Sequence, residues 1–220
     1  GVPIVPTLVD HPVVIEGAPA MVIPMAETGE SVSPFIVGEM TRQLHHLFRN
    51  LDAINNYNHP YRDTRLVNSY RDNLSTHLDP SQLSTIEWLI EKVEKLAEDT
   101  PLEPQTVIHG DIHPGNIVIY QGRPCFIDVD GTARSHPGLE LGKTYASIAQ
   151  FCRIPSYLSR ADLFLAGYGE DFSAFDSPEF QLGRWEKTLS CLSWCATMTE
   201  TSPFHKEEFS SCLLYTSDAA

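Results

Sequence analysis

The stretch HGDIHPGNIVIYQGRPCFIDVDG, residues 109–131, constrains the chain most, because it places polar groups of a narrow chemical kind between short apolar runs. Asp111 and Asn116 lie five residues apart, and Asp128 ends the last apolar run. One Asn or Asp at a loop end is usually a turn former, but three at compatible spacing favour a site. The short strands that the apolar runs predict are Thr106–His109, Ile117–Tyr120 and Pro124–Asp128.

The last two of these strands predict a hairpin whose turn is centred on Gly122. In that register Val118 faces Phe126, and Asn116 faces Asp128. Directly opposed residues of an antiparallel pair have Cβ atoms roughly 4.5–5.5 Å apart. An amide oxygen and a carboxylate would therefore project together, and such hard oxygen ligands suit Mg²⁺.

The spacing from Asp111 to Asn116 matches the catalytic loop of kinases, in which the Asp accepts the proton of the acceptor hydroxyl and the Asn holds a metal ion. Asp128 would take the second metal-binding role, like the Asp of the kinase Asp-Phe-Gly motif. The chemistry requires these residue types, because the base must be an ionised carboxylate and the metal must neutralise charge on the phosphates.

HGDIHPGN followed by FIDVD resembles the signature of the aminoglycoside phosphotransferase and choline kinase family, which has a protein-kinase-like fold. The resemblance implies that Asp111 is the catalytic base and that Asn116 and Asp128 hold Mg²⁺. It also implies that His109 braces the loop and that Asp130 is a supporting acid.

Two further stretches carry the same resemblance. MVIPMAETGE looks like the last strand and the hinge of the N-terminal lobe, which implies that the backbone at Pro24, Met25 and Ala26 meets the adenine of ATP, or the base of GTP. QLHHL resembles the helix motif after the hinge, with His45 as buried packing. His113, two residues after the expected base, is expected to support the site.

The chain departs from the family pattern in two places. No Gly-rich phosphate loop and no strand-borne Lys precede the hinge, so we expect that the chain begins after these elements and transfers phosphate poorly or not at all. Where the family often has Asp-Leu-Ala, the chain reads LELGKTYA. Either Glu140 replaces that Asp, or the local contact is lost.

The remaining pattern predicts an α+β protein, with a small β portion before a mostly helical body. A hairpin is expected from Val13 to Pro24. Helices are expected at residues 33–51, 79–99, 139–152, 160–168 and 178–199. The resemblance implies a partial N-terminal lobe at residues 1–30 and a C-terminal lobe, with the catalytic loop and a metal-binding hairpin, at residues 31–211. We interpret CLLYTSDAA, residues 212–220, as read-through of a sequencing adapter, because transposon-adapter DNA encodes it.

The amino-acid composition limits the classes of partner that the protein can bind. With 15 basic and 29 acidic side chains, the formal net charge is −14, which disfavours nucleic acid and anionic membranes as partners. No apolar run reaches the ~20 residues that span a bilayer. The five cysteines are odd in number and lack framework spacing, so we expect a reducing, cytoplasmic setting. Cys191 and Cys195 are expected on a buried helix face.

Two other functions compete with a kinase. His109, Asp111 and His113 form H-x-D-x-H, which a metal-dependent hydrolase could use, although Pro114–Gly115 indicates a loop there. A kinase-like domain without catalysis, which binds a nucleotide or a partner, is the other alternative.

The sequence therefore favours an ATP-dependent phosphotransferase that acts on a hydroxyl of a small molecule. Aminoglycosides, choline and related amines or sugars are the acceptors that the resemblance implies, and an acidic protein tolerates a cationic acceptor. The acidic residues that could contact such an acceptor are more often simply solvated. They are Glu140, Glu170, Asp171, Asp176 and Glu179.

Overall fold

The computed structural model describes residues 4, 6, 13–15, 18–20, 26, 32–57, 68, 71–72, 74–76, 78–151, 158–169 and 172–198. The described long helices are α1 (Pro34–Leu47), α3 (Pro80–Asp99), α4 (Pro137–Phe151), α5 (Leu158–Tyr168) and α6 (Pro178–Met198). The described strands are β1 (Val13–Ile15), β2 (Ala18–Ala20), β3 (Thr106–Ile108), β4 (Ile117–Tyr120), β5 (Arg123–Phe126) and β6 (Ala133–Ser135). Short 3₁₀ helices are η2 (Pro114–Asn116), η3 (Val129–Gly131) and η5 (Phe172–Asp176).

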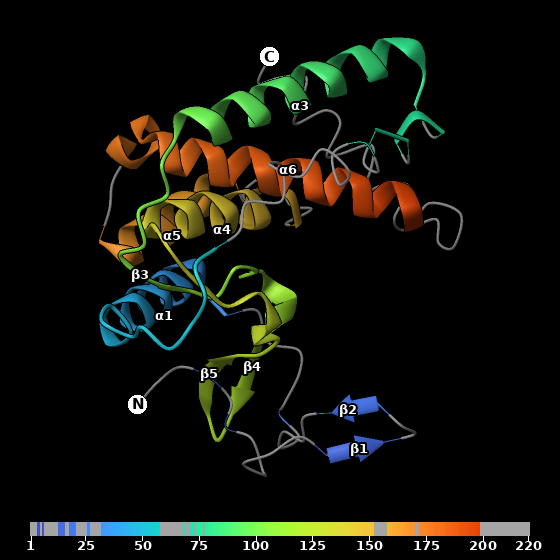
Figure 1. Ribbon diagram of the computed structural model, residues 1–220. Helices are drawn as coiled ribbons and strands as arrows, with labels where there is room; N and C mark the ends of the chain where they lie inside the picture. The colour runs from blue at the N-terminus through green and yellow to red at the C-terminus, as the bar shows by residue number, and fades with distance from the viewer. Residues whose placement is uncertain are drawn as a thin grey trace.

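The helices form a body on one side, and hairpins lie on the other (Figure 1). Helix α6 contacts α3 and α4, α5 contacts α4 and α1, and β3 contacts both α1 and α4. Strands pair only in twos within the described residues, as β1 with β2, β3 with β6, and β4 with β5. This arrangement confirms the predicted α+β class, and the five predicted helices are present with ends shifted by a few residues. No described helix is both long and apolar enough to cross a membrane.

Two apolar clusters hold the helical body together. The first lies mainly between α3 and α6, and its members include Ile86, Leu89, Ile90, Val93, Leu182, Leu189 and Leu192. The second joins α1, α4 and α5, and its members include Met40, Leu44, Phe126, Leu141, Phe164 and Phe180. Each fully buried side chain of this size contributes roughly 1.5–3 kcal/mol. Cys191 and Cys195 are buried and unbridged on α6, as expected from the helical pattern.

Helices α4 and α6 approach closely because each presents a glycine to the backbone of the other. A Cβ atom at Gly142 would lie 2.0 Å from the carbonyl oxygen of Phe180, and one at Gly183 would lie 2.1 Å from that of Leu139. Side-chain carbon cannot fit at such distances, so the contact requires glycine at both positions. This close crossing fixes α6 against the helix that begins just after β6.

The β4–β5 hairpin has a shorter turn than the sequence pattern predicted. Gln121 and Gly122 have φ values of 52° and 72°, the left-handed pair of a two-residue hairpin turn. Val118 therefore pairs with Cys125, and the prediction that Val118 faces Phe126 is wrong by one residue. The expected pairing of Asn116 with Asp128 is wrong for the same reason. Asn116 instead faces Ile127, whose N–H donates to the Asn116 carbonyl at 3.0 Å.

Strand β6 closes the segment that carries the polar cluster. It pairs antiparallel with β3, so that Thr106 faces Ser135 and Ile108 faces Ala133. Residues 109–132 consequently leave and re-enter the body through adjacent strands. The sequence pattern did not predict β6, because ARS is short and lacks the β-branched alternation of a strand.

The described residues test the N-terminal expectations only in part. The β1–β2 hairpin falls within the predicted one, and Ala26 packs against Val118 and Cys125 of β4 and β5. Pro24 and Met25 of the expected hinge lie outside the described residues, as do the expected domain boundary near residue 30 and residues 212–220.

Replacing Gly142 by Ala should push α4 and α6 apart, because the new Cβ atom meets backbone rather than a flexible side chain. We expect the free energy of unfolding to fall by about 1–3 kcal/mol, measured by urea denaturation. Ala166→Leu, at an exposed position of α5, is the control and should change stability by less than about 0.5 kcal/mol. Equal stability of the two variants would contradict the close crossing.

Candidate active site

His109 is the buried support of the loop that follows β3. Its side chain is 1% exposed, and its ring lies edge-on to Phe126 with centroids 5.4 Å apart. Nε2 lies 2.9 Å from the carbonyl oxygen of Ile127, and Nδ1 accepts the backbone N–H of Asp111 at 3.4 Å. Because a carbonyl oxygen can only accept, this pattern fits a neutral imidazole with its proton on Nε2. The ring thus ties the Asp111 backbone to the strand end after β5.

Glu140 fixes the same loop from the helical side. Its fully buried carboxylate, in the first turn of α4, accepts the backbone N–H groups of His109 and Gly110, the latter at 3.1 Å. Burial raises the pKa of Glu140, but the His45 side chain and the His109 backbone lower it more, so the net pKa lies below the ordinary Glu value. A contact between this position and the loop is therefore present in this chain.

His45 lies beside this carboxylate and is buried, as expected. Its Nδ1 atom is 2.9 Å from the Tyr168 hydroxyl, and its Nε2 atom is 3.9 Å from Glu140 Oε2. His45 therefore connects α1 and α5 to the carboxylate that holds the loop.

Asp111 is the half-exposed carboxylate of the loop, with 40% of its side chain exposed. The ammonium group of Lys187, on α6, forms an ion pair with Oδ1, and His113 Nε2 lies 3.8 Å from Oδ2. Partial burial raises the pKa of Asp111, but Lys187 lowers it more, and His113 and Lys143 add to this effect. The net pKa lies below the ordinary Asp value, so Asp111 is ionised at neutral pH and can accept a proton or a hydrogen bond.

Asn116 ends η2 and is nearly buried, with 6% exposure. Its Nδ2 atom donates to the backbone carbonyl of Asp111 at 3.0 Å. The amide nitrogen is thereby used within the loop, which leaves the amide oxygen as the atom that can meet a cation. The same hydrogen bond holds the expected base and the expected metal ligand in a fixed relation.

Asp128 lies beyond the end of β5 rather than within a strand. Its φ and ψ angles are 61° and 62°, a left-handed conformation that costs a non-glycine residue about 1 kcal/mol or more. It is exposed, as is Asp130 in the η3 turn that follows. Burial lowers the pKa of His113 below its ordinary value, although Asp111 and, to a smaller extent, Asp128 raise it, so Asp128 lies within electrostatic reach of the loop.

Helices α4 and α6 contribute three polar groups that the sequence analysis missed. Lys143 Nζ lies 3.1 Å from Glu186 Oε1 and 3.3 Å from the Tyr57 hydroxyl, which itself donates to Glu186. Burial lowers the pKa of Lys143, but Glu186 raises it more, so the net pKa is above the ordinary Lys value. The neighbouring Lys187 reaches Asp111. Lys187 and Asp111 are 76 residues apart in the chain, so no local sequence pattern indicates that they meet.

The histidines of H-x-D-x-H do not converge as metal ligands. His109 uses one ring nitrogen with the Asp111 N–H and the other with the Ile127 carbonyl, and His113 Nδ1 accepts the N–H of Gly115 at 3.1 Å. Within the described part of the chain, no group of three or more His, Cys, Asp or Glu side chains is arranged to hold a metal ion. The hydrogen bonds of these two rings disfavour the hydrolase alternative.

The acidic residues that the sequence offered as possible acceptor contacts are dispersed. Glu140 is neither solvated nor open to an acceptor, because it is buried and holds the loop. Glu179 accepts the Ser177 hydroxyl at 2.6 Å, and Asp176 is exposed. Glu170 and Asp171 lie outside the described residues.

The chain is similar in fold to solved small-molecule kinases. A choline/ethanolamine kinase family protein from Mesorhizobium loti is 18% identical with a TM-score of 0.60, and the match covers 94% of this chain and 73% of that one. A thermostable mutant of aminoglycoside phosphotransferase APH(4)-Ia is 16% identical with a TM-score of 0.61, covering 100% and 78%. The match to a glucosamine kinase is 16% identical with a TM-score of 0.53, and it covers 84% of this chain but only 52% of that enzyme. At these identities the likeness shows the protein-kinase-like fold.

Comparison with curated proteins gave no match. A family model gives the identification: the model of the phosphotransferase enzyme family matches residues 2–180, which is most of the chain. The chain therefore belongs to the phosphotransferase enzyme family.

Proposed function

We propose that the protein is an ATP-dependent phosphotransferase that moves the γ-phosphoryl group to a hydroxyl of a small molecule. The observation that carries this proposal is the ionised Asp111 carboxylate on a loop held by Glu140 and linked to Asn116. Family membership supports kinase chemistry in general, and the site supports the division of roles.

Asp111 acts as the base toward the acceptor hydroxyl. Phosphoryl transfer depends mainly on positioning and on charge stabilisation, so a base must be held in place and ionised more than it must be strong. Lys187 keeps the pKa of Asp111 low, and the loop hydrogen bonds from His109 and Asn116 fix its backbone. A half-exposed carboxylate can still receive a hydroxyl, since a carboxylate has about four acceptor positions.

Asn116 and Asp128 fit Mg²⁺ by the chemistry of their donors. The amide oxygen of Asn116 remains after its nitrogen is used, and Asp128 offers an exposed carboxylate in a strained conformation of the kind that clusters at functional sites. Hard oxygen donors that are few in number suit Mg²⁺, which takes its other ligands from phosphates and water. When bound, the ion would neutralise charge on the nucleotide phosphates.

Solved relatives support the choice of nucleotide. One similar structure is the AMP-bound complex of a spectinomycin phosphotransferase, and another is the amicoumacin kinase hAmiN with AMP-PNP and Ca²⁺. In this chain the nucleotide base, of ATP or GTP, would meet the segment from Pro24 to Ala26. The packing of Ala26 against β4 and β5 places one end of that segment beside the hairpin.

The acceptor of this protein is a compound with a hydroxyl group, and the names of the solved relatives do not indicate what charge it carries. Their names include kinases of ethanolamine, glucosamine and spectinomycin, which differ widely in shape. Aminoglycosides, choline and related amines or sugars are the classes that the sequence resemblance suggests. A binding domain without catalysis would not need an ionised, tethered Asp111, so we favour the enzyme.

Asp111→Ala, in the protein expressed from its complete gene, should lower kcat roughly 10²–10⁴-fold, because the hydroxyl loses its proton acceptor. The Kd for the nucleotide should change by less than about threefold. Steady-state kinetics and a nucleotide titration measure the two effects. Asp99→Asn, at the exposed end of α3, is the control and should leave both unchanged. Full turnover by Asp111→Ala would show that Asp111 is not the base.

Asp128→Ala should raise the Mg²⁺ concentration that gives half-maximal nucleotide binding by about tenfold or more, because one oxygen ligand is lost. Titrations of nucleotide at fixed Mg²⁺ concentrations measure the shift. Asp162→Ala, on helix α5, is the matched control. An unchanged Mg²⁺ dependence in Asp128→Ala would mean that the ion is held elsewhere.

A further inference from the structure

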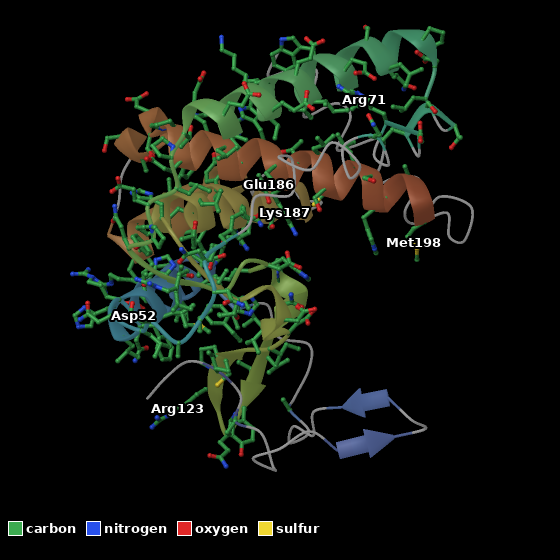
Figure 2. All side chains as sticks on the ribbon, in the orientation of Figure 1. Asp52, Arg71, Arg123, Glu186, Lys187 and Met198 are labelled. Atoms are coloured by element: carbon green, nitrogen blue, oxygen red, sulfur yellow. The ribbon has the colours of Figure 1, made fainter. Side chains whose placement is uncertain are left out.

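Two lysines from the helical body stand beside the candidate base. Lys187 pairs with Asp111, and Lys143 pairs with Glu186 one residue before it. Both lysine side chains are 11% exposed, so their charges are only weakly hydrated. Figure 2 shows Glu186 and Lys187 together near the middle of α6, between that helix and the β-strand side of the molecule.

The carboxylates around these lysines are already matched in charge. Asp111 is balanced by Lys187, and Glu186 by Lys143, while Glu140 is buried against the loop backbone. The pKa of the nearby His113 is lowered, mainly by burial, so this ring adds little positive charge at neutral pH. On α4 and α6, the carboxylates beside these lysines, Glu140 and Glu186, are thus already held by hydrogen bonds or an ion pair.

Lys187 has unused hydrogen-bonding capacity. An ammonium group has three N–H donors, and one of them serves Asp111 Oδ1. For the other two, the structure gives no acceptor among the described residues. A nearly buried donor without a partner is costly, so an anionic oxygen of a ligand would be favoured there.

The position of the base brings the acceptor close to this lysine. The reacting hydroxyl must approach the Asp111 carboxylate within hydrogen-bond distance, about 2.6–3.2 Å. Because Lys187 bonds to the same carboxylate, the groups next to that hydroxyl would approach its ammonium nitrogen. Asp111 offsets the charge of Lys187, so the two remaining N–H donors of Lys187, and not an unmatched charge, would favour an anionic oxygen over an ammonium group at this place.

We propose that Lys187, supported by Lys143, selects an acceptor that carries an anionic group, such as a carboxylate, close to its reacting hydroxyl. This inference rests on the proposed function and narrows its substrate class. The proposed acceptor class differs from the cationic acceptors that the family resemblance suggested, because Lys187 and Lys143 are the charged groups that α6 and α4 bring to Asp111.

Acceptor sets that differ only in charge test the proposal. The probes are D-glucuronate, D-glucose and D-glucosamine as one set, and glycerate, glycerol and 2-amino-1,3-propanediol as the other. The readout is nucleoside diphosphate released by the protein from the complete gene, above the rate with nucleotide alone. We expect the carboxylate members to exceed the ammonium members at least about tenfold in kcat/KM.

The variants separate selectivity from a structural role. Lys187→Gln should reduce the preference for the carboxylate members to below about threefold, mainly through KM, and Lys187→Arg should retain it. Loss of the ion pair with Asp111 lowers kcat for all acceptors alike, so the ratio between charge classes is the discriminating quantity. Lys95→Gln, at an exposed position of α3, is the control and should keep the wild-type ratio.

Three results would overturn the proposal. One is a preference for the ammonium members, the second is equal use of all charges, and the third is a ratio that Lys187→Gln leaves unchanged. If no compound is phosphorylated, inhibition of Asp111-dependent nucleotide hydrolysis replaces transfer as the readout, and inhibition that is not selective for carboxylates overturns the proposal. Absence of any Asp111-dependent turnover would instead refute the proposed function itself.

Discussion

The capture of two backbone N–H groups by the Glu140 carboxylate is the interaction on which the rest of the site depends. His109 and Gly110 lead directly into Asp111, so their N–H groups set the direction in which the loop leaves β3. A charged carboxylate buried without partners would be very unfavourable, whereas one that accepts backbone N–H groups beside His45 is stabilised. The loop and the first turn of α4 therefore hold each other in place.

The position of α4 also fixes α6, and through it the charge beside the base. The paired glycines let the two helices cross closely, which brings Lys143, Glu186 and Lys187 to one wall of the site. One helix crossing thus links the stability of the body to the electrostatics of Asp111.

The sequence predicted the long helices and the loop well, because both depend on local patterns. The apolar stripe of α3 and the Asp111–Asn116 spacing are readable within a few residues of the chain. The register of β4–β5 was missed by one residue, since it depends on left-handed φ angles at both Gln121 and Gly122. The contact of Lys187 with Asp111 joins residues 76 positions apart and depends on how the helices pack, so no local sequence pattern indicates it.

Amide hydrogen exchange at His109 and Gly110, measured by NMR in wild type and in Glu140→Gln, tests the central claim most directly. The amide side chain keeps the shape of Glu140 but loses its charge. The account predicts exchange at least about tenfold faster at both N–H groups, with a parallel loss of turnover. Unchanged exchange at these two positions, or full turnover despite faster exchange, would contradict the claim that Glu140 holds the catalytic loop.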